Sequence, residues 1–105
     1  MNTHDIPTSF RLRRRKWTVK RKPNGRIPAH AGLAQAIPKN IFIYDVALNR
    51  KRTPLEQQKT FWHEATHAVL MTMGHKLAYD EPFVTQFGLL WEEMIRTARF
   101  EESVE

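Results

Sequence analysis

The strongest hydrophobic pattern in the chain lies between residues 54 and 73. Small and apolar side chains recur there every three or four residues, at Phe61, Ala65 and Ala68, and therefore fall on one face of a helix. A neighbouring stripe with the same spacing is formed by Trp62, Val69 and Met73. This period predicts an amphipathic helix with one face against a core.

The ends of this helix are marked by local signals. Thr53 can accept a hydrogen bond from a backbone N–H of the first turn, and Glu56 stands three residues later and completes a capping box. Pro54 suits the first helical position, because its missing N–H is not needed there. Gly74 supplies the left-handed conformation that commonly ends a helix. We therefore predict a helix from Pro54 to about Met73.

A second helix is predicted to begin near Pro82, with Asp80 or Glu81 as its cap. Gly88 falls in its middle, where glycine costs about 1 kcal/mol relative to alanine, and a close helix–helix crossing would offset that cost. The rest of its apolar stripe is formed by Val84, Phe87, Trp91, Met94, Ile95 and Ala98. Because the connection between the two helices is short, we expect them to be antiparallel neighbours.

Two segments have the composition of strands. In Trp17–Lys20 the alternation places Trp17 and Val19 on one face, and residues 41–46 are apolar on both faces. A turn is predicted at residues 23–25, and the alanine-rich segment 29–36 is compatible with a helical turn or a loop. We expect an α+β fold in which a small sheet packs on two main helices, the first of which carries the motif described below.

The chain of 105 residues predicts a single domain, 1–105, with flexible ends at 1–10 and 101–105 and a basic strand region at 11–26. A composition of 41% hydrophobic and 27% charged residues is that of a globular protein and excludes a disordered chain. No apolar run approaches the roughly 20 residues of a membrane span, and no secretory signal is visible. We therefore expect a cytoplasmic protein with no membrane partner.

Candidate chemistry is concentrated at His63, Glu64 and His67, which form the pattern H-E-x-x-H. Residues four apart project from one face of a helix, so both imidazoles can bind one zinc ion. Glu64 lies close enough to take a proton from a zinc-bound water, whose pKa zinc lowers to about 7. Cysteine is absent, so the remaining ligands of a metal must also be histidines or carboxylates.

A catalytic zinc site needs a third protein ligand and one position open to water. Glu81 is the preferred candidate, because the start of the second helix should lie close to His67. Asp80 is its direct competitor and is favoured instead as the helix cap. Leu70 and Met73 stand where the metzincin pattern requires Gly and His, so that class is excluded. Weaker alternatives for the third ligand are His75, Glu92 and Glu93.

The segment Phe61–Leu70, followed by Asp80–Val84 and the step Gly88–Leu90, resembles small phage-type zinc metallopeptidases. These are similar to the ImmA/IrrE-like metallopeptidases and belong broadly with the gluzincins. The resemblance covers residues 40–98 and implies a minimal metallopeptidase core with 41–46 as its active-site strand. It also implies that the Glu that opens the second helix, here Glu81, is the third ligand. A protein or peptide substrate in a phage-infected host cell would fit this family.

The residues and the resemblance together predict a zinc-dependent metallopeptidase. His63, His67 and Glu81 would bind the zinc ion. Glu64 would act as general base on the attacking water and then return the proton to the leaving amine. Tyr79 is the favoured donor for the oxyanion, and the other candidates are His75, Tyr44 and His30.

The segment 41–46 also has two interpretations. An extended peptide could add as a further strand along its edge and present a scissile bond to the zinc. A plain core strand is equally compatible with the sequence.

The charge of the chain is unevenly distributed. Residues 1–52 contain thirteen Lys and Arg against Asp5 and Asp45, a net charge of +11, whereas residues 53–105 have a net charge of −5. The basic stretch Arg11–Arg26 supports a second hypothesis, a non-catalytic binding module that contacts nucleic acid or an acidic protein partner. The two hypotheses are compatible, because a basic strand could dock a peptidase onto its partner.

Overall fold

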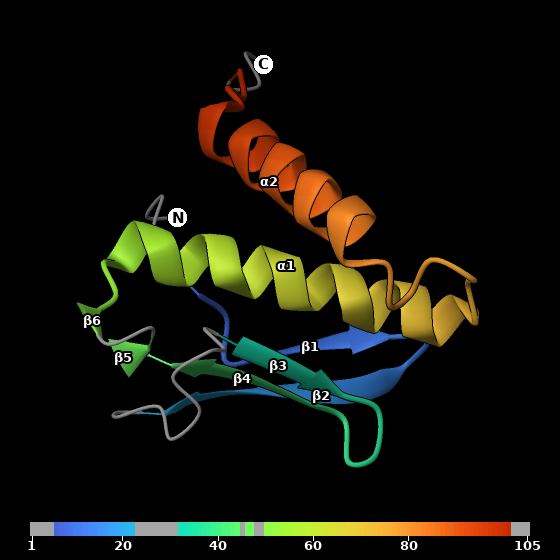
Figure 1. Ribbon diagram of the computed structural model, residues 1–105. Coiled ribbons are helices and arrows are strands. Elements are labelled where there is room, and N and C mark those ends of the chain that lie inside the picture. The colour runs from blue at the N-terminus through green and yellow to red at the C-terminus, as the bar shows by residue number, and fades with distance from the viewer. Residues whose placement is uncertain (1–5, 23–31, 45, 48–49, 102–105) are drawn as a thin grey trace.

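The computed structural model describes residues 6–22, 32–44, 46–47 and 50–101. Its elements follow in the order β1 (Ser9–Leu12), β2 (Arg15–Lys22), β3 (Gly32–Gln35), β4 (Asn40–Tyr44), β5 (Val46–Ala47), β6 (Arg50–Lys51), α1 (Pro54–Met73) and α2 (Glu81–Thr97). The sheet lies against one side of α1, and α2 lies on the other side (Figure 1). This confirms the predicted α+β fold. Neither helix is long and apolar enough to cross a membrane.

The main sheet has four strands in the order β1-β2-β4-β3. Strand β4 is parallel to β2 and antiparallel to β3, so it is hydrogen-bonded on both sides. Of the two interpretations of 41–46, peptide addition along its edge is therefore wrong, because β2 and β3 occupy both edges, and the core strand is confirmed for Asn40–Tyr44. Strand β4 also ends at Tyr44, and Val46 belongs to the separate ribbon of β5 and β6.

Strand β3 lies within the alanine-rich segment for which a helical turn or a loop was expected. Leu33 pairs with Phe42 of β4, and Gly32 lies directly on α1. A Cβ on Gly32 would stand 2.6 Å from Cγ2 of Thr60 and 3.0 Å from Cγ of Glu64. The absence of a side chain at this position lets the edge strand approach the helix. Residues 29–31 and the turn predicted at 23–25 lie outside the described residues.

Strand β1 begins inside the stretch 1–10 that was expected to be flexible. The ring of Phe10 stacks on Trp17 with the centroids 6.0 Å apart, and it meets Phe61 edge-on at the same separation. These contacts order Ser9 and Phe10, which the polar composition of the first ten residues did not reveal. Residues 1–5 and 102–105 lie outside the described residues.

The core lies between the sheet and α1. In β2 the predicted alternation is confirmed, because Trp17 and Val19 are buried against α1. Lys16 and Lys20 consequently belong to the opposite, solvent-facing side of the sheet. The other buried members of this core are Ile41, Ile43, Phe61, Ala65 and Ala68.

Helix α1 has the ends that the sequence predicts. The side chain of Thr53 accepts a hydrogen bond from the Glu56 N–H at 3.1 Å, and the Thr53 N–H donates to the Glu56 carboxylate at 2.9 Å. Gly74 has φ 64° and ends the helix in the left-handed conformation. Helix α2 begins after Asp80, whose carboxylate accepts a hydrogen bond from the Phe83 N–H at 3.0 Å.

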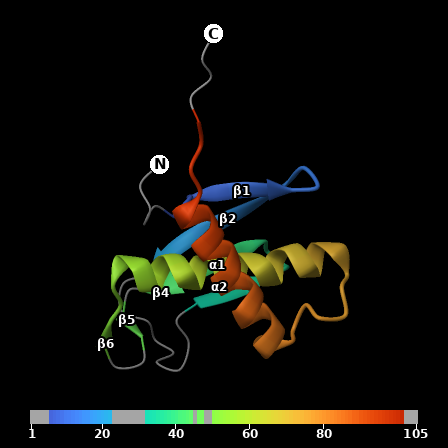
Figure 2. The same ribbon diagram turned by 90° about the horizontal axis from the view of Figure 1, so that it is seen from above.

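The two helices cross obliquely, and α2 leads away from α1 toward its C-terminal end (Figures 1 and 2). At the crossing a Cβ on Gly88 would stand 3.0 Å from Cα of His63, so the predicted close crossing at this glycine is confirmed. The expected antiparallel neighbours therefore meet along only part of α2. As a result Phe87, Trp91 and Met94, which belong to the predicted apolar stripe, are between 39% and 50% exposed.

Candidate metal centre

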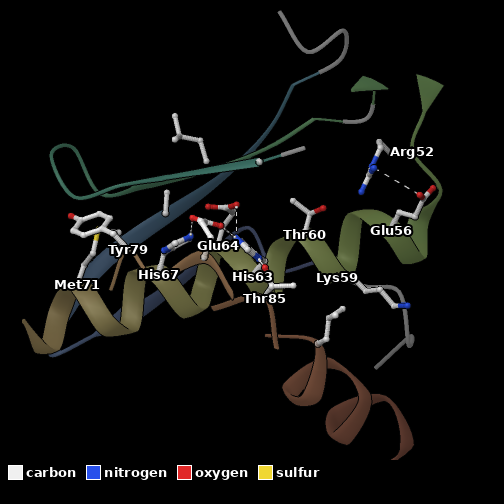
Figure 3. Close-up of a pocket in the computed structure, with 15 residues that line it drawn as sticks. Arg52, Glu56, Lys59, Thr60, His63, Glu64, His67, Met71, Tyr79 and Thr85 are labelled. Atoms are coloured by element: carbon white, nitrogen blue, oxygen red, sulfur yellow. Dashed lines mark hydrogen bonds and ion pairs between the residues drawn. The ribbon is translucent and has the colours of Figure 1, made fainter. Parts of the chain in front are cut away.

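Two histidines of α1 and one carboxylate of α2 form a compact group. His63 and His67 are one turn apart, with ring centroids 5.0 Å from each other. Glu81, the first residue of α2, places one carboxylate oxygen 3.0 Å from Nε2 of His63 and the other 2.9 Å from Nε2 of His67. One ligand atom from each of the three residues lies within 4.8 Å of the others. Both imidazoles face the cleft and lie beside Glu64 (Figure 3).

The position of Glu81 is determined by the residues at which the connection between α1 and α2 begins and ends. Gly74 ends α1, and Asp80 uses its carboxylate to cap α2. The capped start of α2 then lies beside His67, while Gly88 lets the next part of α2 press against α1. Of the two neighbouring carboxylates, the structure therefore brings Glu81 to the histidines and leaves Asp80 at the cap.

The far nitrogen of each imidazole is directed at an oxygen. Nδ1 of His67 donates to the carbonyl oxygen of Ala78 at 2.6 Å, and Nδ1 of His63 lies 3.5 Å from the hydroxyl of Thr85. Such outer partners fix the orientation and the tautomer of metal-binding histidines. Because Nδ1 of His67 is directed at the Ala78 carbonyl, Nε2 is the nitrogen that faces Glu81 and could bind a metal ion.

This donor set fits a metal ion. Nε2 of His67 and a carboxylate oxygen of Glu81 face each other at 2.9 Å, and both atoms are donors that a metal ion can bind. A tetrahedral zinc ion, with bonds of about 2.0–2.1 Å, holds its ligand atoms about 3.3 Å apart, and the three ligand atoms here lie within 4.8 Å of one another. Two histidines and one carboxylate also form a known catalytic zinc set with a fourth position left open. Imidazole suits iron, copper and nickel as well, so the donor set is that of a candidate metal site and does not identify the metal.

Glu64 lies next to this group and is buried. Burial, and secondly the negative charge of Glu81, raise the pKa of Glu64 to about 8, while a hydrogen bond from the backbone of Ala34 opposes the shift. Burial is also the largest cause of a lowered pKa at His63, against the attraction of Glu81. A cation held beside Glu64 would lower its pKa and restore a base near neutral pH.

The group lies in a cleft of about 850 Å³ that is bordered by α1, by β3 and by the start of α2. Arg52 and Lys59 line one end of this cleft, and Met71 and Tyr79 line the other (Figure 3). Tyr79 is 75% exposed, and its hydroxyl points away from the imidazoles in Figure 3. Its function as oxyanion donor stays a prediction.

The other candidate ligands and donors are not brought to the site. Nδ1 of His75 accepts a hydrogen bond from the backbone of Leu77 at 3.0 Å. Glu92 is buried and accepts a hydrogen bond from Arg96 at 2.8 Å. Glu93 is exposed, Tyr44 does not line the cleft, and His30 lies outside the described residues.

Four residues that contact the side chains of His63, Glu64 or His67 were missed by sequence reasoning. They are Gly32 and Ala34 of β3, the backbone of Ala78, and Thr85. Thr85 could have been found, because it lies one turn after Glu81 on the predicted helix. No sequence signal marks the other three, since their positions depend on strand pairing and on a backbone carbonyl.

No protein-family model matches the chain, and no match is found among the curated proteins or the solved structures. The resemblance to small zinc metallopeptidases therefore rests on the motif residues of the sequence. To these the structure adds a group of His63, His67 and Glu81 that could hold a metal ion.

Proposed function

We propose that this protein is a zinc-dependent peptidase. The observation that supports the proposal best is the placement of a buried carboxylate, Glu64, beside the His63–His67–Glu81 group in one open cleft. A purely structural metal site is closed by four protein ligands, whereas a catalytic site has three and leaves a position free. Three protein ligands with an adjacent carboxylate are typical of zinc sites that catalyse hydrolysis.

The residues have separate tasks in this proposal. His63, His67 and Glu81 hold the ion, which when bound supplies Lewis-acid chemistry and a water whose pKa is lowered to about 7. Glu64 takes the proton of the attacking water and returns it to the nitrogen of the leaving amine. The hydrogen bond from the Ala34 backbone holds the Glu64 carboxylate at the wall of the cleft.

The substrate would be an extended segment of polypeptide. Strand β3 is at the edge of the main sheet and borders the cleft. An extended peptide that pairs with this edge would run past Glu64, because β3 contacts this residue through Gly32 and Ala34. The edge available for peptide addition is thus that of β3, in place of the edge of β4.

The experiment compares three proteins that have been loaded with zinc: the wild type, Glu64→Gln and His63→Ala. Each is incubated with a mixture of unfolded peptides, and new peptide termini are identified by mass spectrometry while elemental analysis gives the metal content. We expect new termini with the wild type, zinc without new termini with Glu64→Gln, and loss of both with His63→Ala. Glu93→Gln, an exposed change on α2, is the control and should behave as the wild type.

Two results would contradict the proposal. One is an equal, negligible metal content in the wild type and in His63→Ala. The other is a set of new termini that Glu64→Gln produces as fast as the wild type, since this would assign the cleavage to a contaminating protease.

A further inference from the structure

The hairpin of β1 and β2 carries the densest charge in the described part of the chain. Residues 6–22 contain eight Lys and Arg and neither Asp nor Glu. Five of these cations, Arg11, Arg13, Arg14, Arg15 and Lys16, lie at the turn or next to it, and all are exposed. Within the described ranges none of the five forms an ion pair. Their mutual repulsion disfavours the folded state unless an anionic partner is bound.

The conformation of the turn indicates that Arg13 and Arg14 do not stabilise the fold. Arg13 and Arg14 form a two-residue turn with φ 49° and 67°, the left-handed conformation that Asn-Gly adopts most readily in hairpins. This conformation is unfavourable for residues that carry a Cβ. The side chain of Arg11 donates a hydrogen bond to the carbonyl oxygen of Arg14 at 3.2 Å and so stabilises the turn. Backbone strain at the exposed tip of the hairpin indicates that the side chains of Arg13 and Arg14 have a function.

The charged surface continues from the turn along the open face of the sheet. Since Trp17 and Val19 face the core, Lys16 and Lys20 of β2 lie on the solvent side. Strand β1 is at one edge of the sheet, and β3, which borders the metal site, is at the other. Figure 2 shows the turn of the hairpin at the margin of the molecule, whereas the other end of the hairpin lies near the C-terminal end of α2. A partner bound to the hairpin would therefore leave the cleft open.

The geometry favours duplex DNA over double-stranded RNA and over single strands. The major groove of B-form DNA, about 12 Å wide, admits a two-stranded β-ribbon, whereas that of A-form RNA is too deep and narrow for side chains to read. Single strands are bound by stacking on exposed aromatic rings, but Phe10 and Trp17 of this hairpin stack on each other, and Trp17 is buried.

We propose that the β1–β2 hairpin binds double-stranded DNA in the major groove. Arg13 and Arg14 at the tip enter the groove, where guanidinium groups bind guanine edges or phosphates in pairs of hydrogen bonds. Lys16 and Lys20 contact the flanking phosphates. The proposal depends on the hairpin alone and holds whether or not the metal site is catalytic.

The test is the binding of the full chain to a fluorescent 25-base-pair duplex, followed by anisotropy between 50 and 200 mM NaCl. The decisive variant is Arg13→Asn with Arg14→Gly, because it removes two charges and gives the turn its preferred residues. We expect this variant to be at least as stable as the wild type and to bind the duplex about tenfold more weakly or worse. Lys16→Gln with Lys20→Gln should reduce the slope of log affinity against log salt by about two.

The matched control removes two exposed charges elsewhere, by Lys76→Gln with Arg99→Gln, and should bind as the wild type. The proposal is overturned if this control and the turn variant lose affinity equally, because net charge would then explain the binding. It is also overturned if a single strand of the same sequence, or polyglutamate, binds as tightly as the duplex. Absence of salt-dependent binding at 50 mM NaCl would overturn it as well.

Discussion

Gly88 of α2 lies against the backbone of His63, so that a Cβ on the glycine would stand 3.0 Å from Cα and 3.1 Å from the amide nitrogen of the histidine. The contact involves backbone atoms, which cannot turn aside as a flexible side chain can. Glu81 belongs to the same helix as Gly88, and His63 is one of its partners. The helix crossing and the geometry of the metal site are therefore coupled.

We expect Gly88→Val to push α2 away from α1 and to lower the free energy of unfolding by about 1–3 kcal/mol. Zinc affinity should fall at the same time, because Glu81 would move away from the histidines. Gln86→Val is the matched control, because it introduces the same residue, valine, at an exposed position of the same helix. Urea denaturation and zinc titration check the prediction, and equal stability of the two variants would refute it.

Glu81→Gln should weaken zinc binding by more than about 100-fold, because removal of a ligand costs more than the 10–100-fold measured for its outer partners. Asp80→Asn should leave zinc affinity nearly unchanged, because asparagine also caps a helix. Competition with a chromophoric chelator measures both affinities. A larger loss in Asp80→Asn than in Glu81→Gln would assign the third ligand to Asp80.

In the metal-free protein the contribution of Glu64 to stability should fall as the pH rises from about 4.5 to about 8. In this window the folded protein keeps the proton of Glu64, whose pKa is raised from 4.5 to about 8, while the unfolded chain has released it. The folded state thus binds more protons, and the free energy of unfolding falls with pH. Glu64→Gln should therefore gain stability relative to the wild type across the window, and exposed Glu93→Gln should not. Thermal unfolding in the presence of a chelator at several pH values measures the difference.

Thr53→Ala should destabilise the protein by about 1 kcal/mol, because it removes the side-chain acceptor of the capping box. Thr53→Ser keeps a hydroxyl at this position and should recover most of the loss. Zinc affinity per folded molecule should be unchanged in both variants, since His63 lies well beyond the first turn of α1. A drop in affinity that serine does not restore would show that the cap influences the site.

The features that local signals encode could be predicted from the sequence. The capping box of Thr53 and the left-handed Gly74 define α1, and the i, i+4 spacing of His63 and His67 places both on one face. The approach of Glu81 could be predicted because a short connection and a small residue at Gly88 leave few other arrangements. In each of these cases the determining residues are close in the sequence or lie on one helix.

The features that depend on distant pairing could not be predicted. Gly32–Gln35 shows no alternation, and it becomes strand β3 only because β4 offers it an edge. The same pairing places β4 inside the sheet, which its own residues do not reveal. The periodicity of α2 correctly identifies an apolar stripe, but it does not determine what covers Phe87 and Trp91, both of which remain partly exposed.

The separation of the metal-site residues along the chain has a consequence for stability. His63 and Glu81 are 18 positions apart, and the chain has no cysteine with which to tie the intervening segment. An ion held by both residues would join the two ends of this loop in the folded protein, and it would stabilise the fold because it binds the folded and not the unfolded chain. The ion proposed for catalysis would then also link α1 to α2, so that its removal by a chelator would loosen α2 as well as end hydrolysis.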